Sequence, residues 1–324
     1  MSKLFGMIKG RDKIMICTVT LNPAIDVTLE VSNLKINHYN KVLNARTTSG
    51  GKGINVSKAV RGYDRETIAI GFLGGGRGRM IEEELRGLGI TTNFWHIEEK
   101  TRSNTIISDI KTGEHTLLSE AGPKVTEYDL EMLKSIFYRV MSQSSAVTLS
   151  GSLPRGVPVN IYGDLISIAK KRQVKTILNA SGEQFIKGLD EGPFLAKPDL
   201  REINEVFGIV INKEEDAIKA AKQIIQRGAE IGVVSLQNEK DIIATQEEIW
   251  FAETTYHEIV NIIGAGDALV AGFAIALTEE GKNIEEAIKF SMACALASAL
   301  KEEEEFSSRE EVEKCLQCVN VKRI

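Results

Sequence analysis

A turn of small residues followed by an acid, Gly264-Ala265-Gly266-Asp267, is the segment of this sequence best suited to chemistry. It leads into an apolar stretch, Ala268–Leu277, which predicts a buried helix. Small residues at a helix N-terminus let backbone N–H groups approach an anion, and the helix dipole adds positive potential. A carboxylate suits such a site if it accepts the proton of an alcohol that attacks phosphorus. The segment therefore indicates phosphoryl transfer, and an N-capping aspartate on a buried helix is the alternative.

A second glycine-rich segment is Gly50-Gly51-Lys52-Gly53-Ile54-Asn55. Its lysine is followed by Gly53 and not by the Ser or Thr of a Walker A motif, and it does not match GxGxxG. A dinucleotide-binding site of the Rossmann type therefore has no support. The glycines still allow the backbone to approach a small polar ligand, and Lys52 and Asn55 can hydrogen-bond to hydroxyl groups.

Asp26 lies just after the first predicted strand, in Asn22-Pro23-Ala24-Ile25-Asp26. Open α/β sheets bind ligands beyond the carboxyl ends of their strands, so the residue is well placed for binding. Its carboxylate could accept hydrogen bonds from two sugar hydroxyls. An ordinary turn residue is the alternative.

Alternating strand and helix patterns must position these residues. Short apolar runs such as Met15–Leu21, Thr67–Leu73 and Ala146–Ser150 predict buried strands, and amphipathic segments such as Ile54–Arg61 predict the helices between them. Repeated strand–helix units indicate an α/β fold with a central, mostly parallel sheet flanked by helices.

Val27–Val31 and Tyr39–Thr48 alternate with polar residues and predict half-exposed strands. Three further segments, Phe94–Glu98, Asn104–Ile110 and Thr116–Ser119, interrupt the strand–helix rhythm and predict a small antiparallel element. We therefore expect a single domain over residues 15–324, with a small β insertion near its N-terminal half. Residues 1–14 are interpreted as a leader extension.

Composition excludes several classes of protein. The 324 residues hold 40 basic and 45 acidic side chains, a net charge of −5, which speaks against a nucleic-acid partner. No apolar run approaches the ~18 residues of a membrane span, and residues 1–14 lack the apolar stretch of a signal peptide. Four cysteines in so long a chain make no disulfide framework. We expect a cytoplasmic protein without a membrane partner.

Together, six segments resemble the ribokinase-like sugar kinases of the phosphofructokinase-B family, and most closely the branch with 1-phosphofructokinase and tagatose-6-phosphate kinase. They occur in the family's order and cover nearly all of residues 15–324. They are Thr20-Leu21-Asn22-Pro23-Ala24-Ile25-Asp26, Gly50-Gly51-Lys52-Gly53-Ile54-Asn55-Val56, Thr101-Arg102-Ser103-Asn104, Ser150-Gly151-Ser152-Leu153-Pro154, Lys197-Pro198-Asp199-Leu200-Arg201-Glu202 and Gly264-Ala265-Gly266-Asp267.

The resemblance implies a role for each matching residue. Asp267 is the catalytic base, and Gly264, Ala265 and Gly266 form the anion hole. The substrate-binding residues are Asp26, Gly50, Gly51, Lys52, Asn55 and Ser150, with Arg102 and its helper Lys41 on the phosphate that the sugar already carries. The ATP-binding residues are Lys197, Ser235 and Gln237 together with Gly264 and Gly266, and the residues associated with Mg²⁺ are Glu202 and Asp199. The resemblance further implies a β lid over the sugar, inserted from segments within 27–48 and 92–119, which is also a possible homodimer interface.

Two features depart from the family pattern. Asp199 stands where the family's NxxE motif begins with Asn, so the site gains a carboxylate. The usual Ser-Leu-Gly-x-x-Gly is Ser235-Leu236-Gln237-Asn238-Glu239-Lys240 here, without either glycine. Because Asp267 and the anion-hole residues are intact, we expect activity to survive.

The sequence thus predicts ATP- and Mg²⁺-dependent phosphorylation of a ketohexose monophosphate, fructose 1-phosphate or tagatose 6-phosphate, to the 1,6-bisphosphate. One alternative is a kinase of another sugar or sugar phosphate, such as fructose 6-phosphate. Another is a catalytically idle sugar-phosphate sensor on a kinase scaffold.

Overall fold

The computed structural model describes residues 15–236, 240–256, 259–260, 264–279, 282–301 and 306–324. The leader proposed at residues 1–14 lies outside the described residues. The elements follow the chain in this order: β1 (Met15–Thr20), β2 (Ala24–Val31), β3 (Val42–Gly50), α1 (Lys52–Gly62), β4 (Thr67–Gly74), α2 (Gly75–Gly87), β5 (Thr91–Thr92), β6 (Trp95–Ile97), β7 (Arg102–Asp109), β8 (Glu114–Ser119), α3 (Glu127–Val140), β9 (Ser144–Gly151), α4 (Ile161–Lys171), β10 (Lys175–Ala180), α5 (Gly182–Asp190), β11 (Leu195–Ala196), α6 (Leu200–Phe207), α7 (Glu214–Gln226), β12 (Ile231–Leu236), β13 (Lys240–Ala244), β14 (Ile249–Thr254), α8 (Ala265–Ala276), α9 (Ile284–Ala299), α10 (Arg309–Cys315), the 3₁₀ turn η1 (Leu316–Cys318) and β15 (Val319–Arg323).

A central sheet of 11 strands runs through the described part of the chain in the order β15-β14-β13-β12-β11-β10-β9-β1-β4-β5, with β6 paired to β4. The pairs from β12 to β5 are parallel, whereas β13, β14 and β15 add an antiparallel edge. β1 lies between β4 and β9, and its residues after Met15 are buried, as its apolar and β-branched sequence predicts. The expected mostly parallel α/β fold is confirmed.

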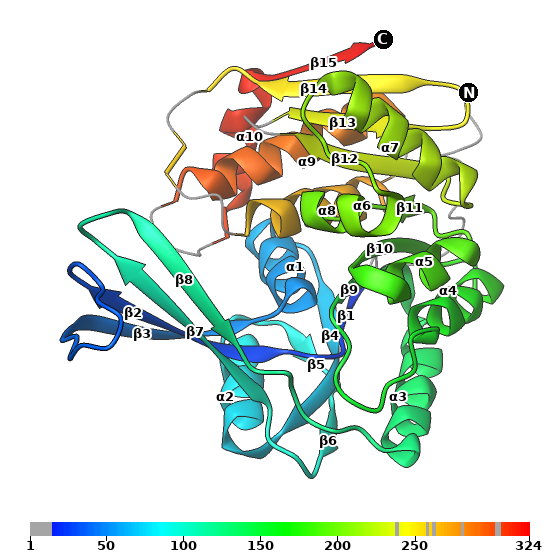
Figure 1. Ribbon diagram of the computed structural model, residues 1–324. Coiled ribbons are helices and arrows are strands. Elements are labelled where there is room, and N and C mark those ends of the chain that lie inside the picture. Colours follow the sequence, from blue (N-terminus) through cyan, green and yellow to red (C-terminus); the bar gives the residue numbers. More distant parts are fainter. Residues whose placement is uncertain (1–14, 237–239, 257–258, 261–263, 280–281, 302–305) are drawn as a thin grey trace.

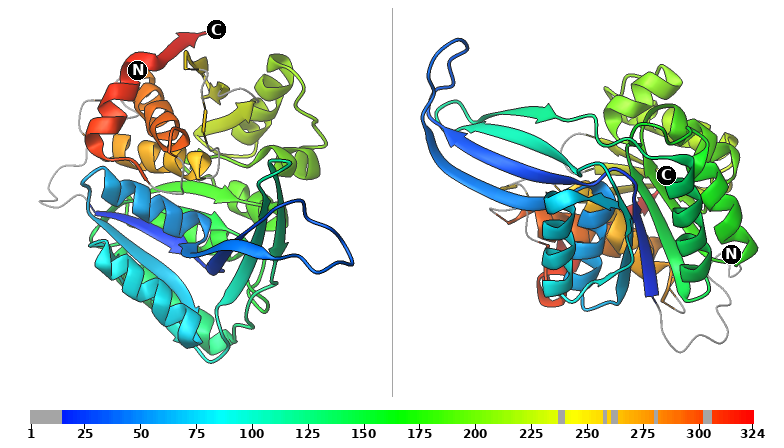
Figure 2. Two further views of the ribbon diagram at one scale, coloured as in Figure 1. Left: turned by 90° about the vertical axis from the view of Figure 1, so that its left-hand side faces the viewer. Right: turned by 90° about the horizontal axis from the view of Figure 1, so that it is seen from below.

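Helices cover both faces of this sheet (Figures 1 and 2). Side chains of α3 to α7 pack into one buried cluster, and those of α1, α8, α9 and α10 pack into another on the opposite face. Helix α8 packs between α1 and α9, and its residues from Asp267 to Ala276 are all buried. An apolar sequence on every side is typical of such a central helix.

A second sheet, which we call the lid, stands away from the body in the order β3-β2-β7-β8 (Figure 1). The hairpins β2–β3 and β7–β8 are antiparallel as expected, but β2 and β7 pair in parallel, so the lid sheet is mixed. The prediction that Phe94–Glu98 belongs to the lid is wrong, because β6 pairs with β4 of the central sheet. Within the range 92–119, the lid takes only β7 and β8.

Three elements were not expected from the sequence. Helix α5 follows the strand at residues 175–180, the two-residue strand β5 pairs with β4, and β15 pairs with β14 after the last helical turn. Among the described residues, no helix is both long and apolar enough to cross a membrane.

Candidate active site

Asp267 lies in the first turn of α8 and is 9% exposed. Its two carboxylate oxygens accept hydrogen bonds from two asparagine amides, Asn55 Nδ2 at 2.9 Å and Asn179 Nδ2 at 3.4 Å. Gly264 caps the helix with a left-handed backbone, φ 83°, a conformation that favours glycine. Its carbonyl oxygen accepts the N–H of Ala268 at 2.9 Å, so the turn 264–267 is tied into the helix start.

Burial raises the pKa of Asp267 from 3.8 to about 6, because the charged form loses its water. The Asn55 hydrogen bond and the nearby Lys52 oppose this rise, Asp199 adds to it, and Lys197 opposes it. A buried carboxyl group with a pKa close to the operating pH is suited to take up and release a proton.

Asp26 and Gly50 are in close contact at the end of β2 and β3 that joins the body (Ala24–Asp26 and Thr48–Gly50), which we call a lid root. β2 and β3 pair so that Ala24 faces Gly50, and a Cβ added to Gly50 would lie 1.8 Å from Asp26 Oδ2. The other carboxylate oxygen, Oδ1, accepts a hydrogen bond from Asn104 Nδ2 at 2.6 Å. Burial raises the pKa of Asp26, although the Asn104 bond and the charge of Arg102 oppose the rise. Glycine at position 50 therefore makes room for this carboxylate.

Replacing Gly50 with Ala is expected to lower the free energy of unfolding by about 1–3 kcal/mol, because the new methyl group must displace the Asp26 carboxylate. Chemical denaturation of both proteins measures this difference. Gly87→Ala is the matched control, because a Cβ there meets nothing within 4 Å. Its unfolding free energy is expected to stay the same or rise slightly. Equal effects of the two substitutions would contradict this account.

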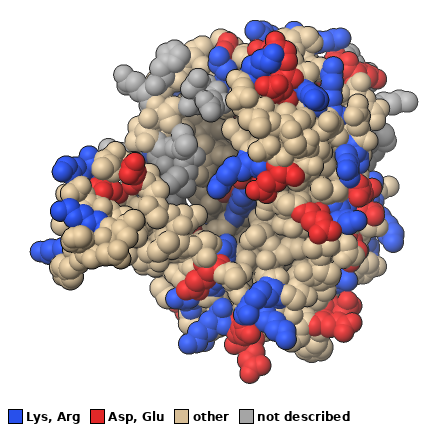
Figure 3. All heavy atoms as spheres, in the orientation of Figure 1, with Lys and Arg blue, Asp and Glu red and all other residues tan. Residues whose placement is uncertain are grey.

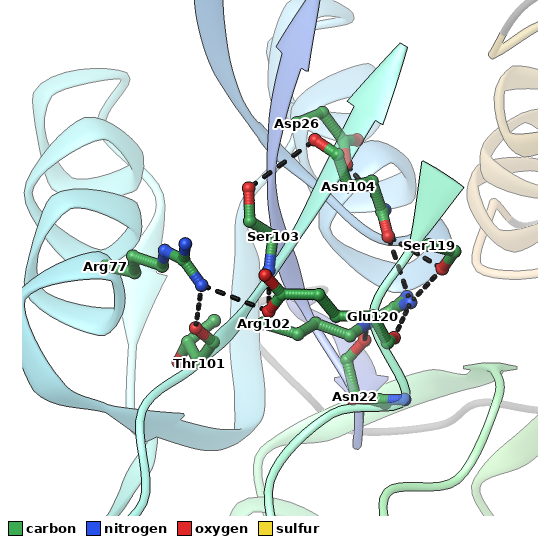
Figure 4. Close-up of polar contacts among 9 residues, drawn as sticks. All are labelled: Asn22, Asp26, Arg77, Thr101, Arg102, Ser103, Asn104, Ser119 and Glu120. Carbon is green, nitrogen blue, oxygen red and sulfur yellow. Dashed lines mark hydrogen bonds and ion pairs between the residues drawn. The ribbon is translucent and has the colours of Figure 1, made fainter. Parts of the chain in front are cut away.

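Arg102 begins β7, and its guanidinium is held in a fixed plane (Figure 4). Nε donates to the Asn22 carbonyl oxygen at 3.1 Å. Nη1 donates to Asn104 Oδ1 at 3.2 Å, to Ser119 Oγ at 2.8 Å and to the Glu120 carbonyl oxygen at 3.2 Å. The second terminal nitrogen takes part in none of these bonds within the described residues, and so it is available to a ligand.

Lys52 reaches across the site from the start of α1 to the start of α6. Its Nζ lies 2.5 Å from Asp199 Oδ2 and 3.8 Å from Glu202 Oε1. Lys197 Nζ lies 3.7 Å from the other oxygen of Asp199, and a Cβ added to Gly266 would lie 3.6 Å from the same nitrogen. Burial would raise the pKa of Asp199, but the two lysines hold it below its usual value. The extra carboxylate of this chain is therefore balanced by two cations.

Asp199 and Glu202 also offer oxygen ligands of the kind that Mg²⁺ prefers. The backbone N–H of Asp199 donates to Glu202 Oε2 at 2.7 Å, which orients the second carboxylate beside the first. The donor set thus fits a hard divalent cation. Among the described residues no group of three or more His, Cys, Asp or Glu side chains surrounds one position, so substrate or water oxygens would have to complete the shell.

We also expected Ser150, Ser235 and Gln237 at the site. Ser150, at the end of β9, is fully buried, and its Oγ has no hydrogen-bond partner among the described residues. Ser235 Oγ donates to Asp241 Oδ1 at 2.7 Å. Gln237 lies outside the described residues.

Lys41 is not brought to Arg102 within this chain. It is exposed and precedes Val42, which pairs with Val31 at the far end of β2. Val31 and Asp26 are five positions apart along β2, and a strand rises about 3.3 Å per residue. The expected pairing of Lys41 with Arg102 on one phosphate is therefore not formed in a single chain.

Asn179 and Asn104 were not assigned roles from the sequence. Asn179 lies near the carboxyl end of β10, the edge at which open α/β sheets bind ligands, so its position along the strand was the available signal. Asn104 lies inside the segment Thr101–Asn104, but its partner Asp26 is 78 residues away. The surface between lid and body is hollowed, with basic and acidic side chains beside the hollow (Figure 3).

Comparison with known proteins gives a consistent result. Residues 15–311 match the description "pfkB family carbohydrate kinase". The 1-phosphofructokinase of Bacillus subtilis is 32% identical over 310 residues, which is 96% of this chain and 100% of the relative. The tagatose-6-phosphate kinase of Staphylococcus epidermidis is 30% identical over 292 residues, 89% of this chain and 93% of the relative. A solved structure described as a possible 1-phosphofructokinase from Thermotoga maritima has a TM-score of 0.87 and 32% identity, and the match covers 96% of this chain and 99% of that one.

Proposed function

The chain belongs to the pfkB family of carbohydrate kinases, and from this premise we propose that it phosphorylates a ketohexose monophosphate with ATP. The substrate is fructose 1-phosphate or tagatose 6-phosphate, and the product is the 1,6-bisphosphate. The observation that carries the proposal is the buried Asp267, with a pKa raised to about 6, at the N-terminus of α8. The hydroxyl that accepts the phosphoryl group needs a base to take its proton. The positive end of a helix dipole stabilises the negative charge on the transferred group.

In the proposed reaction, Asp267 takes the proton of the attacking sugar hydroxyl. Asn55 and Asn179 hold its carboxylate oxygens in place. Backbone N–H groups of the turn 264–266 stabilise the charge on the transferred group, and the buried Lys197 adds a cation beside Gly266. The shape of the lid root then decides which sugar hydroxyl reaches Asp267.

Asp26 and Arg102 bind the two ends of the substrate in this proposal. The carboxylate of Asp26 accepts hydrogen bonds from sugar hydroxyls, and the guanidinium of Arg102 suits a phosphate. Asp199 and Glu202 would hold Mg²⁺, which supplies charge neutralisation on the phosphates of ATP when bound. Lys52 would then lose part of its attraction to Asp199 and could hydrogen-bond to a hydroxyl of the sugar.

The lid also supports a proposal about assembly and location. Exposed large apolar side chains occur on its strands and in the loops that join them: Ile36, Tyr39, Val42, Leu43, Ile110, Leu117 and Leu118. Exposed apolar patches mark interaction sites, so we propose that two chains form a homodimer through their lids. A kinase of sugar phosphates that uses ATP works where both occur, and a cytoplasmic location belongs to the same proposal.

A substrate panel tests the function. Release of ADP is measured with fructose 1-phosphate, tagatose 6-phosphate, fructose 6-phosphate and fructose, each with ATP and Mg²⁺. The highest kcat/KM is expected with one of the first two compounds. A preference for fructose 6-phosphate or fructose would assign the chain to a different sugar kinase. Binding of a sugar phosphate without any ADP release would identify an idle sensor instead.

The pH dependence of turnover follows from the raised pKa of Asp267. The base must be ionised, so kcat/KM, which follows the ionisation of the free enzyme, is expected to fall as the pH drops through about 6. The substrate's own phosphate also titrates at a pKa of about 6, so the fall must be larger than the titration of the substrate alone produces. A fall no larger than that between pH 8 and pH 5 would argue against Asp267 as the base.

A further inference from the structure

Two charged residues of α2 lie on one face of that helix. Arg77 and Glu84 are seven residues apart, which is about two helical turns, so their side chains leave the helix in nearly the same direction. Between them, Gly78 and Ile81 are buried, and Ile81 packs with Ile25 of the lid root in one apolar cluster. This face of α2 is therefore fixed to the body and turned toward the lid root.

Glu84 binds the point at which β3 leaves the lid and enters the glycine turn. Its Oε2 accepts the backbone N–H of Ser49 at 3.0 Å, and its Oε1 accepts Lys58 Nζ at 2.7 Å. Lys58 Nζ also donates to the Ser49 carbonyl oxygen at 3.0 Å. Both backbone groups of Ser49 are thus tied to one partly buried ion pair, one residue before the Gly50 that contacts Asp26.

Arg77 binds the other root of the lid, where β7 begins and β8 ends (Figure 4). Its Nη1 donates to the Thr101 carbonyl oxygen at 3.4 Å and to Glu120 Oε2 at 3.1 Å. The same oxygen of Glu120 accepts the backbone N–H of Ser103 at 2.9 Å. The carbonyl oxygen of Glu120 in turn accepts a hydrogen bond from Arg102. Arg77 is therefore linked to Arg102 through Glu120. In the same way, Glu84 is linked to Asp26 through Ser49 and its neighbour Gly50.

We propose that Glu84 and Arg77 are positioning residues, which hold the two lid roots on α2 and thereby set the geometry of Asp26 and Arg102. Neither residue touches the reacting atoms. The inference rests on the proposed function only in naming a sugar phosphate as the ligand of Asp26 and Arg102. The attachment of the lid to α2 is a separate claim and is tested separately.

Glu84→Gln tests the first contact. The amide keeps the size of the side chain but turns one acceptor into a donor, which would face either the Ser49 N–H or the Lys58 ammonium. The KM for the sugar phosphate is expected to rise about tenfold, the cost of one lost charge-assisted hydrogen bond, whereas the KM for ATP stays within about twofold. Glu83→Gln, on the exposed neighbouring position, is the matched control and is expected to change neither value.

Arg77→Met tests the second contact, in which the Arg77 and Glu120 side chains are exposed at 42% and 55%. Because an exposed ion pair contributes little free energy, the expected effect is a rise of about two- to fivefold in the KM for the sugar phosphate alone. Arg79→Met, at an exposed position on the same helix, is its control. Three results would overturn the inference. The KM for ATP could rise as much as the KM for the sugar phosphate, neither Glu84→Gln nor Arg77→Met could raise the KM for the sugar phosphate, or the control variants could raise it equally.

A distance measurement separates this inference from the proposed function. Spin labels at Thr116→Cys on β8 and Tyr138→Cys on α3, both exposed positions, report the lid angle in a Cys318→Ser background. Dilution with unlabelled protein removes distances between chains. Glu84→Gln is expected to shift or broaden the distance distribution, and an unchanged distribution would overturn the inference. This readout needs no turnover, so it holds even if none of the sugars in the panel is a substrate.

Discussion

Asp267→Asn is expected to lower kcat by about 100- to 10,000-fold, the usual contribution of a general base. The asparagine keeps an oxygen that can accept the hydrogen bond from Asn55, and its amide group can donate to Asn179 Oδ1, which has no partner among the described residues, once the Asn179 amide turns over. The new asparagine cannot take up the proton of the attacking hydroxyl. The KM values for sugar phosphate and ATP are expected to change little, because the interaction is lost mainly in the transition state.

The same substitution is expected to stabilise the protein at neutral pH. The folded state raises the pKa of Asp267 from 3.8 to about 6, so the folded chain binds this proton more tightly than the unfolded chain does. The stability that protonation confers is complete below pH 3.8 and is lost as the pH rises through about 6. Removing the buried charge should therefore add roughly 2–3 kcal/mol to the free energy of unfolding at pH 8 and little at pH 4.

Two measurements check this pair of effects. Steady-state kinetics with the best substrate of the panel gives kcat, and denaturation at pH 4 and pH 8 gives stability. Loss of turnover together with increased stability distinguishes a catalytic residue from a structural one, because a structural aspartate would lose both on replacement. Turnover within tenfold of the parent protein would contradict the role of Asp267 as base.

The sequence was sufficient for the central sheet because its strands carry a local signal. A run such as Met15–Thr20 consists of apolar and β-branched residues, and such a short run is typical of a strand that is buried on both faces. The lid was harder to delimit. Trp95–Ile97 has the same polar alternation as the lid strands, but its parallel pairing with β4 depends on contacts that no short window of sequence contains. The contacts of this strand in the folded protein, and not its local sequence propensity, determine which sheet it joins.

In the candidate site, too, local sequence identifies the motifs but not the contacts between them. Each motif could be identified from the neighbours of one residue, as with Gly264–Asp267. The contacts between motifs could not be predicted: Lys52 meets Asp199 across 147 positions, and Asn55 meets Asp267 across 212. The sheet order brings these segments to one edge. The separation of Lys41 from Arg102 within one chain could not be predicted either, because it depends on the register of β2 with β3.

Arg102→Ala is expected to raise the KM for the phosphorylated sugar by about 10- to 100-fold, since a charge-assisted hydrogen bond to phosphate is among the stronger polar contacts. The guanidinium is already oriented by Asn22, Asn104 and Ser119, so the free chain has little ordering left to do when the ligand arrives. Its loss removes both the charge and this preorganisation. Turnover at saturating sugar phosphate should fall much less, because Asp267 is not touched.

Three comparisons make the Arg102 result specific to phosphate. Arg102→Lys keeps the charge but not the planar fork, so its KM should lie between those of the parent and the alanine variant. Arg79→Ala removes an exposed arginine of α2 and should leave KM unchanged. The KM for unphosphorylated fructose should also be unaffected by Arg102→Ala, because that sugar offers no dianion to the guanidinium. An equal rise for fructose and for the sugar phosphate would mean that Arg102 acts only by supporting the lid root through Asn22 and Ser119, and the phosphate would then need another cation.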